Sequence, residues 1–316
     1  MRRALLIGRA EVFSPNSADK DRAILRAVAQ RLQGRGWTVD ELSEEALVPA
    51  SLEWARQESA GRARPVGADS NRALSAPTAP HPSPAPYKRQ MPEADICLSM
   101  GRLPATLAWL RLSEAEGRRV VNSPRGVERC ARGVVDGIMR SRGIPVAPLY
   151  NVGGMDAGSR GYWLKRAGGA AQSHADVCHT DYNGVPAAVE SFASRGIDEV
   201  LITEHVAGDV VKFYGVDSGR DDSFFRWYYP TDDGDTKFGD ETVNGKAHHY
   251  TFSADALHRD VARLAHVVGV TIYGGDCIVR PDGSYVIIDF NDWPSFSRCR
   301  DAAAAAIADA VTADIS

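Results

Sequence analysis

Three oxygen-donating side chains occupy matched positions on one predicted hairpin. Asp276 precedes a first apolar run, Asp289 and Asn291 close a second, and a Pro-Asp-Gly turn at 281–283 joins the two. This pattern predicts an antiparallel pair, in which the far ends of the strands meet. Residues two apart on a strand share a face, so the three side chains should converge. Such oxygen donors suit Mg²⁺, with Mn²⁺ as an alternative; acids that merely face solvent are the other interpretation.

A lysine followed by a run of small residues could bind phosphate. Lys165 lies in a predicted strand at 162–166, and Gly168 and Gly169 follow it directly. An ammonium group on a strand is held in a fixed position, while a glycine loop offers backbone N–H groups and can close as a lid. The pattern indicates a phosphate-binding strand and loop, with a surface lysine before a turn as the alternative.

The first part of the chain should form the scaffold beside these residues. A buried strand at 3–8, a helix at 21–33 and a strand from 37 predict a β-α-β unit with parallel strands. A further strand is expected at 94–100. Between them lies a proline-rich insertion at about 60–92, which we expect to be exposed. The first lobe should end at residue 123.

The remaining chain predicts two more lobes, at 124–203 and 204–316, of mixed helices and strands. The fold class is therefore α/β, with an α+β nucleotide-binding part. Helices are expected at 126–142, 186–195, 254–268 and 301–311, and strands at 162–166, 200–205, 210–215, 224–229, 277–280 and 285–290.

Composition narrows the class of protein. The 316 residues are 44% hydrophobic and 25% charged, as in ordinary globular enzymes. A net charge of −4 gives no general attraction for nucleic acid or anionic membranes, so neither is expected as a partner. No stretch approaches the ~20 apolar residues of a membrane span. The five scattered cysteines lack metal-binding spacing, and we expect them to be reduced in a cytoplasmic protein.

The hairpin residues carry a resemblance to a known family. Asp276, an acid thirteen positions later and Asn two further resemble the metal motif of the ATP-grasp superfamily. The similarity extends from about Asn122 to the C-terminus, and the chain resembles glutathione synthetase and the ribosomal-protein glutamate ligases within this superfamily. It implies an ATP-grasp fold behind a Rossmann-like parallel-sheet lobe, with ATP and Mg²⁺ as cofactors. Most of these ligases have Glu where this chain has Asp289, and the Asp-x-Asn form is similar to that of inositol-trisphosphate kinases.

The resemblance also implies roles in nucleotide binding. Residues 201–209 resemble the hinge between the family's two lobes, where Glu204, His205 and Val206 would bind adenine and Asp209 would hold ribose. Lys165, Gly168 and Gly169 would then contact the phosphates.

Four basic residues complete the expected site. Arg132 stands eleven positions before Gly143, where the family usually has a phosphate-binding lysine, and arginine keeps that charge. Lys212 matches a basic residue that reaches phosphate or substrate, with a solvated lysine as the alternative. Arg298 and Arg300 flank a loop past the metal motif and would suit a carboxylate or phosphate, although ordinary surface arginines are equally consistent.

The combined pattern favours an ATP-dependent ligase that joins a carboxylate to an amine through an acylphosphate. A small-molecule kinase and a non-catalytic nucleotide-binding module are the alternatives. The acceptor would be a small molecule or a peptide, bound near residues 14–17, 101–102 and 292–298. The oligomeric state is left open, with a homodimer as one alternative.

Overall fold

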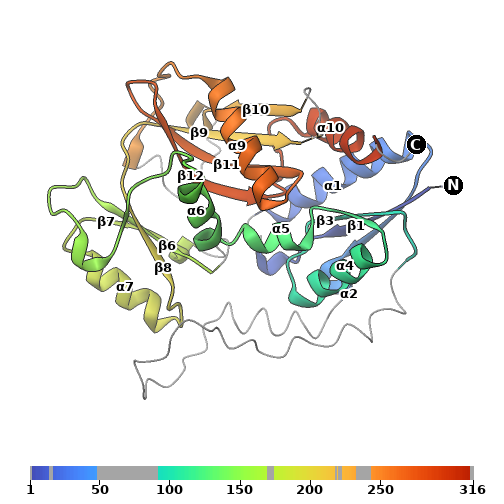
Figure 1. Ribbon diagram of the computed structural model, residues 1–316, viewed down its shortest axis with the longest axis horizontal. Coiled ribbons are helices and arrows are strands. Elements are labelled where there is room, and N and C mark those ends of the chain that lie inside the picture. The colour runs from blue at the N-terminus through green and yellow to red at the C-terminus, as the bar shows by residue number, and fades with distance from the viewer. Residues whose placement is uncertain are drawn as a thin grey trace.

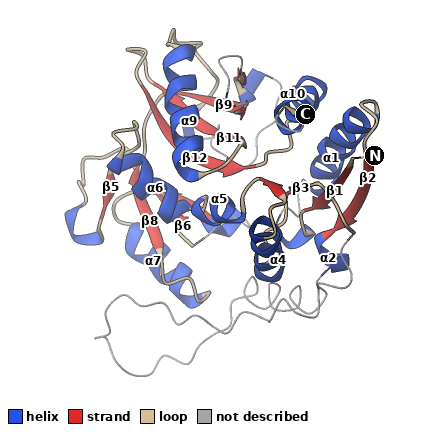
Figure 2. Cartoon of the chain, turned by 45° about the vertical axis from the view of Figure 1, so that its right-hand side comes forward, coloured by secondary structure: helices blue, strands red, loops and turns tan. Residues whose placement is uncertain are grey.

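The computed structural model describes residues 2–13, 17–47, 92–168, 174–217, 219, 223–232 and 243–313. Three four-stranded sheets carry the fold, and helices pack against each of them (Figures 1 and 2). The expected α/β class is confirmed. The proline-rich insertion lies outside the described residues except for its last position. No described helix is long and apolar enough to cross a membrane.

The first sheet is parallel, with the order β2-β1-β3-β4, and confirms the expected β-α-β opening. Residues alternate between its faces: Leu6 packs in the cluster of α1, whereas Leu5 packs in the cluster of α4. Helices on both faces explain why β1 and β3 read as continuous apolar runs. The elements are β1 (Arg3–Gly8), α1 (Ala18–Gln33), β2 (Thr38–Ser43), α2 (Glu44–Leu47), β3 (Ile96–Ser99), α4 (Pro104–Ala115) and β4 (Arg119–Val121).

The second sheet is antiparallel, with the order β10-β9-β11-β12, and contains the predicted hairpin. Its elements are β9 (Asp209–Val216), β10 (Phe224–Tyr228), β11 (Ile272–Val279) and β12 (Tyr285–Asp292), with the helices α9 (Ala254–Val268) and α10 (Arg300–Thr312). In Figure 1, α9 lies over the sheet and α10 lies beside α1.

One sequence expectation about this hairpin was wrong. Asp276 does not open β11 but lies in its middle, because the strand begins at Ile272. Because Gly274 and Gly275 are weak strand formers, the start of this strand could not be recognised from the sequence. A Cβ on Gly275 would lie 2.1 Å from the carbonyl oxygen of Asp289, so a glycine is required for the two strands to approach.

The third sheet has the order β5-β8-β6-β7 and a core of its own. Tyr162 and Leu164 pack with Phe192 of α7, so the alternate residues Trp163 and Lys165 face the other side. The elements are β5 (Leu149–Tyr150), β6 (Tyr162–Arg166), β7 (Val177–Thr180), α7 (Val185–Ser194) and β8 (Val200–Glu204). The short strands β5 and β7 were not predicted.

The helix expected at 126–142 is in fact two helices, α5 (Pro124–Arg129) and α6 (Arg132–Ser141). Ala131 has an extended backbone that breaks them, and the Gly133 amide then donates to the Ala167 carbonyl at 2.9 Å. The break therefore turns the start of α6 toward the strand that carries Lys165. Short 3₁₀ helices lie at Glu11–Phe13, Val152–Gly154, His174–Asp176 and Pro230–Asp232.

The first and second sheets share one hydrophobic core. Trp293 and Phe296, which follow β12, are fully buried among residues of α1, α10 and the first sheet. Val135 and Met139 of α6 pack instead with α9 and the second sheet. The lobe boundaries at 123 and 203 stay predictions.

Candidate active site

The three predicted metal ligands lie together on the hairpin. Asp276 on β11 pairs directly with Asp289 on β12, beside a register shift between Asp276 and Cys277. The Asn291 side-chain amide donates to Oδ2 of Asp289 at 2.6 Å. Both carboxylates keep about a quarter of their side-chain surface exposed, at 22% and 26%, so an ion could reach them. Two carboxylates and one carboxamide form a donor set that suits Mg²⁺.

The residues that the structure describes contain no competing metal site made of His, Cys, Asp or Glu side chains. Within the described ranges, no group of three or more His, Cys, Asp or Glu side chains could hold a metal ion. The hairpin set has only two such residues, and its third donor is an amide. Among the acidic residues at 232–235, Asp232 is described, whereas residues 233–235 lie outside the described part.

Basic side chains neutralise both hairpin carboxylates. Lys212 on β9 pairs in register with Asp276, and its Nζ lies 2.7 Å from Oδ1. Burial alone would lower the pKa of Lys212, but the attraction of Asp276 outweighs it and the pKa is raised. Arg132, the first residue of α6, places Nη2 3.6 Å from Oδ1 of Asp289.

Neighbouring positive charges also keep the Asp289 carboxylate ionised. Burial would raise the pKa of Asp289, but the charges of Arg132 and Lys165 and the hydrogen bond from Asn291 together lower it below its ordinary value. A metal ligand must be deprotonated to bind, and this environment keeps the carboxylate in that form at neutral pH.

Lys165 connects the third sheet with the hairpin. Its Nζ donates to the carbonyl oxygen of Ile288 at 3.1 Å, one residue before Asp289. The two elements border a small cavity of about 30 Å³. The wall of this cavity combines charged and apolar residues: Arg132, Lys165, Asp289, Met139, Leu201 and Ile288. Gly168 follows β6, whereas Gly169 lies outside the described residues.

The predicted hinge begins within β8, at the edge of this cavity, and continues beyond the strand. The Glu204 carboxylate accepts hydrogen bonds from Tyr150 Oη at 3.2 Å and Ser159 Oγ at 3.3 Å. His205 is buried, and its Nδ1 accepts a hydrogen bond from the Trp163 indole at 3.2 Å. Val206 packs with the apolar side chains of β11 and β12. The hinge is therefore tied to both sheets.

Asp209 has structural partners in this state. Its side chain is 1% exposed, and its two oxygens accept the backbone amides of His248 at 2.7 Å and Tyr250 at 2.9 Å. These contacts fasten the segment before α9 to the start of β9. A ribose hydroxyl would have to compete with both amides, and the assignment of Asp209 to ribose stays a prediction.

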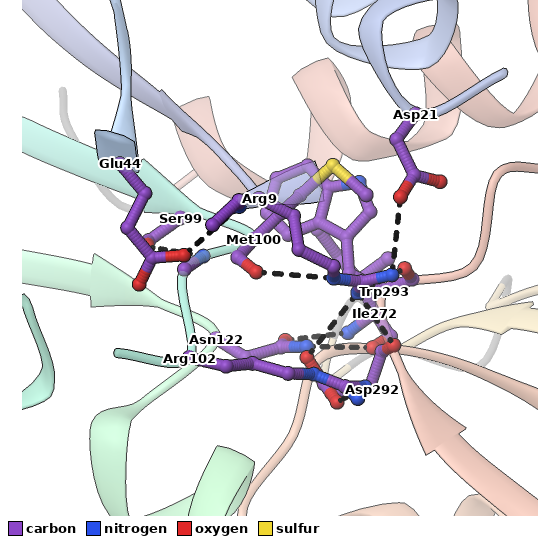
Figure 3. A network of polar contacts seen from close by, with 12 residues as sticks. Arg9, Asp21, Glu44, Ser99, Met100, Arg102, Asn122, Ile272, Asp292 and Trp293 are labelled. Atoms are coloured by element: carbon purple, nitrogen blue, oxygen red, sulfur yellow. Dashed lines mark hydrogen bonds and ion pairs between the residues drawn. The ribbon is translucent and has the colours of Figure 1, made fainter. Parts of the chain in front are cut away.

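The predicted acceptor-side residues Arg298 and Arg102 have different partners. Arg298 donates to the carbonyl oxygens of Tyr229 at 3.4 Å and Pro230 at 3.2 Å, so it is anchored at the end of β10. Arg102 instead pairs with Asp292 (Figure 3). Residues 14–16 of the expected acceptor loop lie outside the described part.

Two charged residues near the hairpin have buried side chains whose pairing was not predicted from the sequence. Asp292 follows the last predicted ligand, and Arg9 follows β1. Strand alternation gives a signal for Asp292, because the residue after Asn291 must face the opposite side. Arg9 has no comparable local signal, because its partners are distant in the sequence.

The order of the three sheets and the placement of the hairpin define the class of structure. The chain has the ATP-grasp fold, and a parallel-sheet lobe precedes it in the sequence. Solved structures that match it include D-alanyl-alanine synthetase A from Vibrio cholerae, at 12% identity and a TM-score of 0.62, with 99% of this chain and 98% of that chain covered. A RimK-domain ATP-grasp protein from Sphaerobacter thermophilus matches at 16% identity and a TM-score of 0.60, with 98% and 99% covered.

A third match is the ATP-grasp ligase PsnB solved with a minimal precursor, at 15% identity and a TM-score of 0.56, with 99% of both chains covered. At these identities, the likeness shows the fold. No protein-family model and no curated protein sequence matches the chain.

Proposed function

We propose that the protein is an ATP- and Mg²⁺-dependent ligase that activates a carboxylate as an acylphosphate and joins it to an amine or a similar nucleophile. The observation that carries this proposal is the grouping of Lys165 and Arg132 around Asp289. Fixed cations opposite a metal-binding carboxylate are what a triphosphate with its metal ion requires.

Each residue has a role in this proposal. Asp276, Asp289 and Asn291 would hold Mg²⁺, which when bound neutralises the phosphate charge. Lys165, Arg132 and Lys212 would turn from their present carbonyl and carboxylate partners to phosphate oxygens. Positioning and electrostatic stabilisation supply most of the catalysis in phosphoryl transfer, so no nucleophilic side chain is needed.

An oxygen of the substrate carboxylate attacks the γ-phosphorus, and the bond to ADP breaks. The amine attacks the acyl carbon, loses a proton, and phosphate leaves. Two of the matching structures support this choice of nucleotide and metal. The D-alanine–D-alanine ligase from Bacillus anthracis was solved with ATP, and PsnB was solved with Mg and ADP.

A small-molecule kinase is the second candidate. Asp289 has the shorter side chain at a position where the resembling ligases carry Glu, and this Asp-x-Asn form favours the kinase. A kinase would pass the γ-phosphoryl group to a hydroxyl and keep it there.

The test compares products over panels of acids, amines and polyols. A ligase forms ADP and free phosphate only when both a carboxylate and a nucleophile are present. A kinase forms ADP and a phosphorylated polyol without free phosphate. ADP formation that does not depend on a divalent metal would overturn both.

We also propose a cytoplasmic enzyme, since the five cysteines, all in the described part, are free thiols.

A further inference from the structure

The hairpin of β11 and β12, which carries the predicted metal ligands, ends in a buried carboxylate. Asp292 is the last residue of β12 and follows Asn291. Neighbouring residues in a strand face opposite sides, so Asp292 points away from the predicted ligands and toward the first sheet. Its side chain is 1% exposed, and Figure 3 shows it facing Arg102. A buried carboxylate at such a position is costly unless it is paired.

Two arginines from the first sheet supply the pairing. Arg102, which follows β3, donates from Nη2 to Oδ1 of Asp292. Arg9, which follows β1, lies 3.7 Å from Oδ2 of Asp292 and donates to the carbonyl oxygens of Trp293 at 3.0 Å and Met100 at 3.3 Å. The network therefore ties the carboxyl ends of β1 and β3 to the residue after a predicted metal ligand.

The backbone beyond Asp292 is strained and held on both sides. Trp293 has a φ of 32°, in the left-handed region that bulky residues rarely adopt. Its side chain is fully buried, its amide donates to the Ile272 carbonyl at 3.0 Å, and its own carbonyl accepts from Arg9. Such conformations persist only where the surroundings fix them, and they cluster at functional sites.

We propose that Asp292, held by Arg9 and Arg102, is a positioning residue that sets the orientation of Asn291 toward the metal ion. The inference rests on the proposed function, since it concerns the metal that function requires. Removal of a residue that orients a metal ligand, without itself contacting the ion, typically lowers the metal affinity by about 10- to 100-fold. Asp292 acts through its neighbour in the strand and does not itself contact the ion.

The experiment measures equilibrium Mn²⁺ binding by electron paramagnetic resonance of the full-length protein with a non-hydrolysable ATP analogue. Asp292→Asn and Arg102→Met should each raise the Kd for Mn²⁺ by about tenfold or more. Binding of the analogue without metal should stay within about twofold, because the cations at the nucleotide cavity are untouched.

The matched control is Arg119→Met. Arg119 also joins the first sheet to the C-terminal part, through the carbonyl oxygens of Ala310 and Val311 at 3.1 and 3.2 Å, and these contacts go to α10 rather than β12. This variant should keep the wild-type Kd for Mn²⁺. A tenfold loss in the control would show that any weakened contact between these parts has the same effect.

A double-mutant cycle separates positioning from general weakening. If Asp292 acts through Asn291, Asp292→Asn should change Mn²⁺ affinity less than about twofold in an Asn291→Ala background. A tenfold effect in both backgrounds, or none in either, overturns the inference. If Asp292→Asn does not fold, Arg102→Met decides through the same cycle. Failure of the wild-type protein to bind Mn²⁺ would instead overturn the proposed function.

Discussion

Lys212 Nζ lies 2.7 Å from Oδ1 of Asp276, so an ammonium group of the protein itself neutralises a predicted metal ligand. The two residues are direct neighbours in register across β9 and β11. A divalent ion that binds Asp276 would have to displace this contact, and the freed lysine would then be available to phosphate. Metal binding and phosphate binding should therefore be coupled through Lys212.

Lys212→Met tests this coupling. Removing one member of a largely buried ion pair leaves the other unpaired, so the free energy of unfolding should fall by about 2 kcal/mol. Because Asp276 then lacks its lysine partner, about 10 mM Mg²⁺ should raise the Tm more in the variant than in the wild type. Thermal unfolding with and without Mg²⁺ measures both effects. The exposed Lys246→Met is the control, and an equal Mg²⁺ response in all three proteins would contradict the coupling.

Asp289→Ala and Asn291→Ala should each reduce metal-dependent ADP formation by about 100-fold or more, since each removes a predicted ligand. Far-UV circular dichroism should remain that of the wild type, because both side chains are partly exposed rather than in the core. Asp282→Ala, in the exposed turn of the same hairpin, should keep full activity. Unchanged ADP formation in either ligand variant would remove the metal assignment.

Arg132→Met and Arg132→Lys separate charge from geometry. Arg132 donates to the Arg166 carbonyl at 3.1 Å and also lies near Asp289. Loss of the charge should raise the KM for ATP about tenfold or more, whereas lysine keeps the charge and should raise it only about threefold. Steady-state kinetics measure the difference. Arg129→Met, at the end of α5, is the control, and equal effects of lysine and methionine would exclude a charge role.

The buried carboxyl group of Glu44 should make the free energy of unfolding depend on pH. It is fully buried after β2, and burial raises its pKa from 4.5 to about 7, although the backbone amides of Leu103 and Ala10 donate to it. Between these pH values the folded protein holds a proton that the unfolded chain has released. The stability that Glu44 contributes is therefore complete below about pH 4.5 and declines as the pH rises through about 7.

Urea unfolding from about pH 5 to about pH 8 measures this decline. The free energy of unfolding of the wild type, minus that of Glu44→Gln, should fall by about 2 kcal/mol across this range. Glu45→Gln, the neighbouring residue, should keep the wild-type pH profile. A difference that stays constant with pH would show that Glu44 is ionised throughout.

Local sequence patterns predicted the hairpin and the neighbourhood of its ligands. Strand alternation brought Asp289 and Asn291 to one face, and the Pro-Asp-Gly turn set the register as far as Cys277 opposite Ile287. The register shift that then places Asp276 opposite Asp289 was not predicted. The β-α-β opening followed from equally local periodicity. These features depend on residues close together in the chain, which explains why they could be read from the sequence.

Other features depend on contacts between distant residues. Arg102 and Asp292 are 190 positions apart, and no local pattern signals their pairing. The partners of Asp209 come from a segment about forty residues later, which periodicity cannot assign. The break at Ala131 also depends on tertiary structure, because it lets the start of α6 reach the strand of Lys165.

The burial of α10 against α1 has a consequence for how the chain unfolds. Ile307 and Ala308 of that last helix lie in the same core as Leu6 and Val28 from the beginning of the chain. A fragment that stops after β4 would expose this apolar surface to water. The two ends of the chain should therefore melt together as one cooperative unit, while the third sheet, with its separate core, can open without them.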